Sequence, residues 1–105
     1  RERCYRESPV STKLADGMAC STPVEEALDV IWREVSRIVE VSDEEVASAM
    51  RLLFECTHNV SEGAGAAATA AAMQDQSLNK GRRIGVVLTG GNVDSKVFSR
   101  VLGSR

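Results

Sequence analysis

Residues 86–94 read Val-Val-Leu-Thr-Gly-Gly-Asn-Val-Asp, and this stretch decides the fold. It completes an apolar run over residues 84–88, which does not alternate with polar residues and therefore predicts a buried strand. Thr89 and two glycines close that strand, and a helix is expected to follow. Ligands bind at the carboxyl ends of strands in open α/β sheets, so this turn is the first candidate for a ligand site. The same residues also suit an ordinary strand-to-helix turn, in which the glycines supply positive φ angles.

Two segments on the amino-terminal side carry clear signals of a helix start. Thr22 is expected to cap a helix over residues 22–35, because a side-chain oxygen there can accept a free backbone N–H. Apolar residues recur along this segment at helical spacing, which predicts one buried face. These residues are Val24, Leu28, Ile31 and Val35. Ser42 and Glu45 have the spacing of a capping box, which predicts a second helix over residues 42–59.

The remaining segments alternate between strand and helix patterns. Residues 37–41 predict a short strand, residues 64–73 a helix made mostly of alanine and glycine, and residues 94–102 a last short helix. We therefore expect an α/β fold, specifically part of an open, mostly parallel sheet flanked by helices. Two parallel strands do not make a stable sheet alone, so the sequence predicts an incomplete domain.

Composition excludes several classes of protein. The chain has 105 residues, of which 43% are hydrophobic and 27% are charged, as in one globular domain. The net charge of −2 gives no basic footprint for nucleic acid, and no 18-residue apolar run suggests a membrane span. The three cysteines form no C-x-x-C pair, which favours reduced thiols and a cytoplasmic location. We expect no metal site.

Two residues outside the turn are further candidates for ligand contact, and each also has an ordinary structural interpretation. Glu62 lies between the end of one predicted helix and the start of the next, where the helix dipole alone favours a carboxylate. Gly17 follows an aspartate, and Asp-Gly is a common turn pair. The lone histidine, His58, is expected at a helix end in a structural role. The sequence contains no serine–histidine–carboxylate set and no P-loop for phosphate.

Four segments together resemble the threonine/serine dehydratases. They are Ala-Asp-Gly at residues 15–17, Val-Ser-Asp-Glu-Glu at residues 41–45, Glu-Gly-Ala-Gly-Ala-Ala at residues 62–67, and the stretch 86–94. They occur in the same order and at similar spacing in that family, and serine racemases share the arrangement. The resemblance covers about residues 5 to 103. It implies a pyridoxal-phosphate enzyme with the fold of the tryptophan-synthase β-subunit.

The resemblance implies cofactor-binding roles for four residues of this chain. Thr89 matches the hydroxyl, usually a serine, that bonds the pyridine nitrogen of the cofactor, and Gly90 follows it in the same turn. Glu62 matches a glutamate beside the ring and the substrate, although Gly63 follows it here where the family usually has proline. Gly17 matches a loop glycine whose backbone approaches the ring.

Other family elements lie upstream of the segment that this chain resembles. These are the Schiff-base lysine in its serine-x-lysine motif, the glycine-rich phosphate cradle, and the metal site of some members. Lys13, Lys80 and Lys96 do not lie in such a motif. The resemblance therefore assigns no catalytic residue and no metal ligand to this chain, and we expect the isolated chain to be inactive.

The resulting expectation is that residues 1–105 form the carboxyl-terminal portion of a dehydratase catalytic domain. The parent enzyme would convert threonine or serine to a 2-oxo acid and ammonia, with pyridoxal 5'-phosphate as cofactor. It is expected to be a homo-oligomer that binds neither nucleic acid nor membranes. Two alternatives stay open: a serine racemase, and a non-catalytic α/β module that serves interaction or structure.

Overall fold

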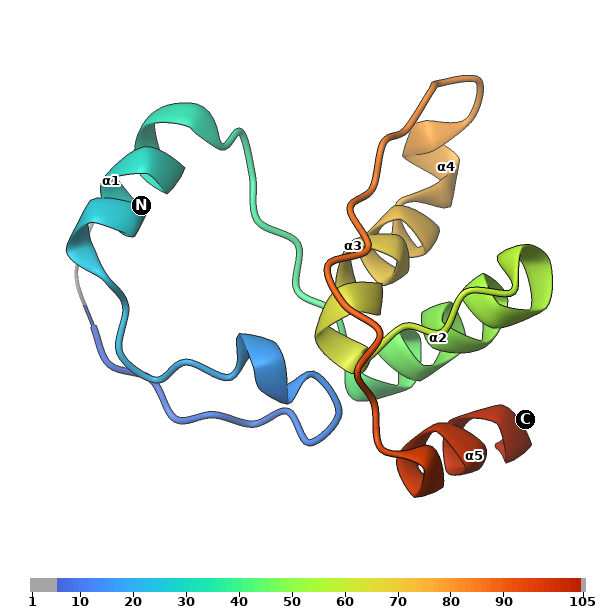
Figure 1. Cartoon of the computed structure of the whole chain (residues 1–105). Coiled ribbons are helices and arrows are strands. Elements are labelled where there is room, and N and C mark those ends of the chain that lie inside the picture. Colours follow the sequence, from blue (N-terminus) through green and yellow to red (C-terminus); the bar gives the residue numbers. More distant parts are fainter. Residues whose placement is uncertain (1–5, 105) are drawn as a thin grey trace.

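The computed structural model describes residues 6–104, and every regular element in that range is helical. In chain order the elements are the 3₁₀ turn η1 (Asp16–Met18), α1 (Glu25–Glu34), α2 (Asp43–Thr57), α3 (Gly63–Gln74), α4 (Gln76–Asn79) and α5 (Ser95–Gly103). Figure 1 shows α2, α3 and α5 gathered on one side of the molecule and α1 on the other. No helix in the described range has the length and apolar character to cross a membrane.

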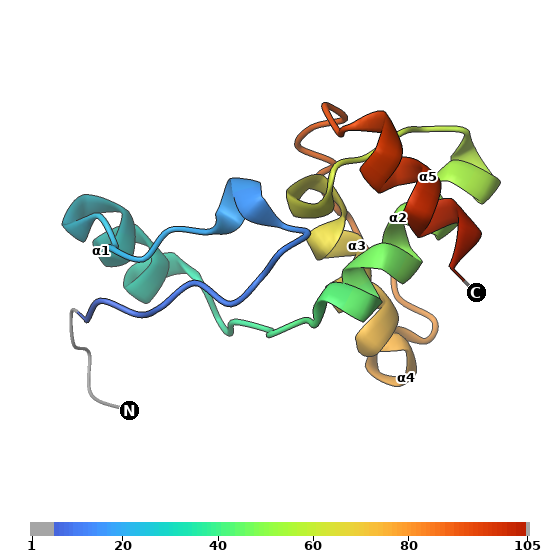
Figure 2. The ribbon, with the colours of Figure 1, turned by 90° about the horizontal axis from the view of Figure 1, so that it is seen from below.

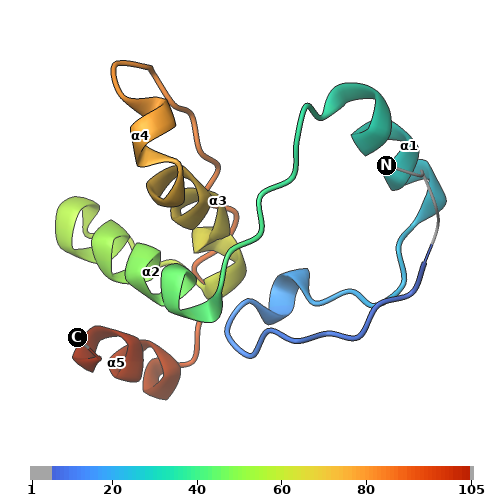
Figure 3. The same cartoon turned by 180° about the vertical axis from the view of Figure 1, so that it is seen from behind.

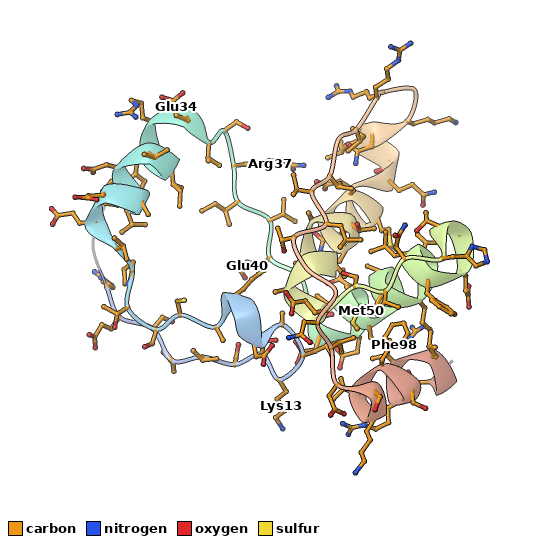
Figure 4. The ribbon with its side chains drawn as sticks, viewed as in Figure 1. Lys13, Glu34, Arg37, Glu40, Met50 and Phe98 are labelled. Carbon is orange, nitrogen blue, oxygen red and sulfur yellow. The ribbon has the colours of Figure 1, made fainter. Side chains whose placement is uncertain are left out.

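The core lies where α2 packs against α3, with α5 beside α2 (Figure 3). Met50 of α2 is completely buried there, and Figure 4 shows its side chain between the helices. Phe98 of α5 meets Phe54 of α2 edge to face, with ring centroids 5.5 Å apart. The other buried apolar side chains of this cluster are Val46, Ala49, Ala66, Ala67, Ala70 and Val101.

The ends of α2 and α5 follow from local chemistry. Ser42 and Glu45 form the expected capping box, because the Ser42 hydroxyl accepts the Glu45 N–H and the Glu45 carboxylate accepts the Ser42 N–H. The helix ends at His58, which adopts the left-handed conformation with φ of 57°. Asp94 caps α5 by accepting the N–H groups of Lys96 and Val97. These helices confirm the predictions for residues 42–59 and 94–102 to within about two residues at each end.

Helix α3 confirms the predicted small-residue helix and begins one residue earlier, at Gly63. Because its side chains are mostly methyl groups or hydrogens, neighbouring backbone can approach it closely.

Arg51 of α2 forms hydrogen bonds with the end of α5. Its guanidinium donates to the Val101 carbonyl at 3.0 Å and to the Ser104 hydroxyl at 3.2 Å. The last turn of α5 is thereby held against α2.

The prediction of an α/β fold is wrong for the residues that the structure describes. Neither residues 37–41 nor residues 84–88 form a strand, and both run as irregular connections beside α3 (Figure 1). The second segment was expected to be buried, yet Ile84 is 49% exposed and Val87 is 71% exposed. A strand needs a neighbouring backbone to complete its ladder, and no described segment takes that position. The apolar run over residues 84–88 indicates side chains that favour burial, but it does not indicate whether a neighbouring strand is present to pair with it.

The prediction for the first helix is only half right. Helix α1 forms, but it begins at Glu25, and its N-cap position is held by Val24 without a side-chain hydrogen bond. The Thr22 hydroxyl donates instead to the Glu7 carboxylate at 3.3 Å. The expected buried face is absent, because no residue of α1 is buried and α1 packs against no other described helix. Figure 2 shows that α1 and the connections on either side of it, residues 20–38, extend away from the core; this segment is called the arm below.

Cys20 and Cys56 are free and exposed thiols, whereas Cys4 lies outside the described residues.

Candidate functional site

The first turn of α3 is enclosed by backbone from two distant segments. A Cβ atom on Gly63 would lie 2.1 Å from the Leu14 carbonyl oxygen, and one on Gly65 would lie 2.5 Å from the Gly90 carbonyl oxygen. Successive helical residues are about 100° apart around the axis, so these two glycines face nearly opposite directions. Only a hydrogen in place of a side chain permits both contacts. The turn of residues 63–65 is therefore the point where the predicted site residues converge.

Glu62 and Gly90 are in direct contact beside this turn. The Glu62 N–H donates to the Gly90 carbonyl at 3.0 Å. A Cβ on Gly90 would lie 2.4 Å from Oε1 of Glu62, so the carboxylate covers the Cα of this glycine. The adjoining Ser61 is completely buried, and its hydroxyl donates to the Glu62 carbonyl at 2.9 Å. Backbone geometry thus fixes the place from which the Glu62 side chain starts.

Thr89 precedes Gly90 on the same turn, and its side chain is exposed. Its hydroxyl has no hydrogen-bond partner among residues 6–104. A hydroxyl can both donate and accept, so it remains available to a ligand at this position.

Gly17 approaches the same helical turn from the other segment. A Cβ on Gly17 would lie 3.1 Å from the Cβ of Ala64, which is tighter than an ordinary van der Waals contact. Gly17 itself is exposed and belongs to η1. The structure therefore brings three segments that are far apart in the sequence to one turn of α3: Gly17, Glu62, and Gly90 with the adjoining Thr89.

An interaction that the sequence analysis missed holds the loop before Gly17. The Asp43 carboxylate accepts the Lys13 N–H at 2.8 Å and also accepts the Thr12 hydroxyl. The Thr12 hydroxyl oxygen in turn accepts the Ala15 N–H at 3.0 Å. The Thr12 hydroxyl, followed by the Lys13 N–H, lowers the pKa of Asp43 below its usual range. An aspartate just after an N-cap is typical of helix starts in general, so the sequence offered no signal of this role.

A groove of about 490 Å³ runs along α3 but does not coincide with the candidate site. Its apolar wall includes Met18, next to Gly17, and Ala68 and Ala71 of α3. Figure 4 shows Arg37 reaching from the connection before α2 toward this side of the molecule, where it pairs with Asp75. Neither Thr89 nor Glu62 lines the groove. The described lysines, Lys13, Lys80 and Lys96, are all exposed.

Comparison with known proteins finds relatives with closely similar names. The chain is 35% identical over 89 residues to an L-threonine ammonia-lyase of Thermotoga maritima, an alignment that covers 85% of this chain and 22% of the relative. It is 38% identical over 91 residues to a phenylserine dehydratase of Ralstonia pickettii, an alignment that covers 86% of this chain and 28% of that relative. It is 32% identical over 104 residues to a catabolic L-threonine dehydratase of Staphylococcus aureus, an alignment that covers 96% of this chain and 30% of that relative.

The chain thus spans between about a fifth and a third of the length of these relatives. A family model described as pyridoxal-phosphate dependent enzyme matches residues 1–90, which include Gly17, Glu62, Thr89 and Gly90. On this match, the chain belongs to the family of pyridoxal-phosphate dependent enzymes.

Proposed function

We propose that this chain is the carboxyl-terminal portion of the catalytic domain of a pyridoxal-phosphate enzyme that deaminates a β-hydroxy amino acid. Threonine and serine are the proposed substrates, and a 2-oxo acid and ammonia are the products. The printed names of the relatives support this reaction class. The observation that carries the proposal is the docking of the Thr89–Gly90 turn against Glu62 at the first turn of α3.

The site residues fit one edge of the cofactor. The Thr89 hydroxyl is exposed and has no partner among the described residues, so it can serve a ring nitrogen. Because Gly90 has no side chain, the Glu62 carboxylate can lie directly against its Cα. This set suits the nitrogen edge of an aromatic ring. Within residues 6–104 we assign no residues to the phosphate group of the cofactor.

Thr89 would determine the protonation of the ring nitrogen. The cofactor, when bound, supplies an electron sink for the bond cleavage at the substrate's α-carbon. A neutral hydroxyl is a much weaker acid than a carboxylic acid, so Thr89 can donate a hydrogen bond without giving up its proton. A carboxylate in its place would favour the protonated ring. A ring nitrogen left unprotonated gives a weaker sink, which suits β-elimination.

Glu62 would orient the ring and the substrate. Its position is set from both sides, because its N–H is held by the Gly90 carbonyl and its own carbonyl accepts the Ala66 N–H in α3. The carboxylate can then accept hydrogen bonds from a substrate hydroxyl or ammonium group. The base that takes the α-proton is assigned to no residue of this chain. We further propose that the complete enzyme is a cytoplasmic homo-oligomer.

Product analysis tests the reaction class. The complete enzyme that contains this chain, loaded with pyridoxal phosphate, is incubated separately with L-threonine and L-serine, and both 2-oxo acid and D-amino acid are quantified. We expect 2-oxo acid as the main product. D-serine as the main product would identify a racemase, and the absence of cofactor binding together with both products would favour a non-catalytic module.

Variants of Thr89 test the assigned role. In the complete enzyme, we expect Thr89→Ser to retain the cofactor absorbance and most of the elimination rate, because the hydroxyl remains. Thr89→Ala should lose about 10- to 100-fold in rate, corresponding to a lost hydrogen bond of about 1–3 kcal/mol. Thr89→Asp should change the absorbance through ring protonation. Thr22→Ala, an exposed threonine in the arm, is the control. If all three Thr89 variants match the control, Thr89 is only a turn residue.

A further inference from the structure

Asp43 makes its strongest contacts outside its own helix. As the first residue of α2 it could accept free N–H groups of that helix, but the capping box of Ser42 and Glu45 already serves this end. Both Asp43 carboxylate oxygens are used by the loop 30 residues earlier, Oδ2 by the Lys13 N–H and Oδ1 by the Thr12 hydroxyl. The carboxylate therefore joins the start of α2 to this loop.

The Thr12 hydroxyl connects Asp43 to the backbone of the following loop residues. Its hydroxyl donates to Asp43, and the same oxygen accepts the N–H groups of Leu14 at 3.3 Å and Ala15 at 3.0 Å. One side chain thus closes the turn and anchors it. The next residues are the ones that touch α3: the Leu14 carbonyl lies against Gly63, and Ala15 is only 4% exposed.

The loop ends at the candidate site. The Leu14 carbonyl lies where a side chain at Gly63 would be, directly after Glu62, and Gly17 lies against Ala64. A shift of the loop would therefore move Gly17 relative to Glu62. Gly63 has no side chain and therefore leaves room for the loop backbone, since a Cβ there would lie 2.1 Å from the Leu14 carbonyl oxygen.

We propose that Asp43 and Thr12 are positioning residues of the cofactor site, which together hold residues 12–17 against the first turn of α3. The inference rests on the proposed function, since it assigns to that site the residues that fix its geometry. The low pKa of Asp43 agrees with it, because the ionised carboxylate can accept both hydrogen bonds at neutral pH. Figure 4 shows the Lys13 side chain pointing away from the core, and the hydrogen bond to Asp43 comes from the backbone N–H of Lys13.

Conservative variants of Thr12 provide the test. Thr12→Val removes the hydroxyl at nearly constant volume, and Thr12→Ser restores it. In the complete enzyme carrying pyridoxal phosphate, amide hydrogen exchange of residues 14–18 is measured together with the cofactor dissociation constant and absorbance. We expect Thr12→Val and Asp43→Ala to speed exchange in residues 14–18 and to weaken cofactor binding, each about tenfold, as for a lost hydrogen bond to a charged group. Thr12→Ser should return both values to within about threefold of the original protein.

Two comparisons separate positioning from helix stability. Ser42→Ala removes the capping box of α2 without touching the loop, so it should speed exchange at the start of α2 and leave residues 14–18 unchanged. The double variant of Thr12→Val with Asp43→Ala should lose less than the sum of the two single variants, because both lose the shared hydrogen bond between Thr12 and Asp43. Additive effects would contradict the proposal, as would a loosened loop with unchanged cofactor affinity and absorbance.

The same data distinguish this inference from the proposed function. A complete enzyme that binds no pyridoxal phosphate even before substitution would refute the proposed function and the cofactor half of the inference. Amide exchange of residues 14–18 would still decide whether Asp43 and Thr12 hold the loop, because it is measured without any turnover.

Discussion

Helices α1 and α2 both have an apolar stripe in the sequence, but only α2 has a partner. Met50 on α2 is completely buried against α3, whereas Val35, the last residue of the stripe along α1, is 48% exposed. Helix α2 also has a capping box, whereas α1 has no side-chain cap. An amphipathic pattern therefore indicates which face of a helix favours burial, but it does not indicate whether any segment of the chain will cover that face. The following predictions test this difference between core and arm.

Truncating the core should cost far more than truncating the arm. Met50→Ala removes a completely buried side chain, and we expect the free energy of unfolding to fall by about 2–5 kcal/mol. Ile38→Ala removes a side chain that is 75% exposed and should cost no more than about 0.5 kcal/mol. Chemical denaturation of both variants measures the difference. Equal losses would mean that the arm is as tightly packed as the core.

Adding one methyl group to the α3 turn should also destabilise the core. In Gly65→Ala the new Cβ would lie 2.5 Å from the Gly90 carbonyl oxygen, which forces the turn away from Glu62. We expect a loss of about 1–3 kcal/mol. Gly103→Ala in α5 is the matched control, because nothing lies within 4 Å of its new Cβ. A Gly65→Ala protein as stable as this control would show that the close approach at α3 is not real.

The two helix starts should respond differently to loss of a hydroxyl. Ser42→Ala removes the cap of α2 and should cost about 1 kcal/mol. Thr22→Ala should leave the helicity of α1 unchanged, because Thr22 caps nothing in that helix. Amide exchange in the first turns of α1 and α2 measures both effects. Faster exchange in α1 after Thr22→Ala would restore the original prediction that Thr22 is its N-cap.

Acid should weaken the start of α2 by a smaller amount. The Thr12 hydroxyl lowers the pKa of Asp43 from 3.8, and the Ser42 N–H followed by Gln74 lowers the pKa of Glu45 from 4.5. Because both pKa values are lower in the folded state, their contribution to stability is complete above these ordinary values. It is lost as the pH falls through the lower folded-state pKa values. The free energy of unfolding should therefore fall as the pH is lowered from about 5 to about 2. In Asp43→Asn it should fall less steeply than in the unsubstituted protein. The control is Glu55→Gln, which removes one exposed charge.

Local signals in the sequence predicted the helical core well. Ser42 with Glu45 and the alanine-rich stretch of α3 specify their helices through short-range chemistry, which the chain itself contains. The predictions for residues 84–88 failed because burial of an apolar run depends on a neighbour, and no described segment is that neighbour. The N-cap at Thr22 failed for a similar reason, since its hydroxyl found Glu7 instead.

The site was predictable only in part. Glu62, Thr89, Gly90 and Gly17 came from a resemblance in ordered motifs, and the structure brings Glu62, Gly90 and Gly17 together at one turn of α3. Their roles toward a cofactor stay predictions. The contact between Asp43 and Thr12 could not be anticipated, because it joins residues 31 positions apart through side chains that also suit a helix start and a turn.

The contacts of the loop with Asp43 and Gly63 have a consequence for the order of folding. Helices α2 and α3 are neighbours in the chain, so their contact closes only a short loop, whereas the Thr12 contact must close one of about 30 residues. Contacts between distant residues form more slowly than local ones. During refolding we therefore expect helical circular dichroism to return before protection of the amides of residues 14–18. The polypeptide would then become compact first and competent for cofactor binding later.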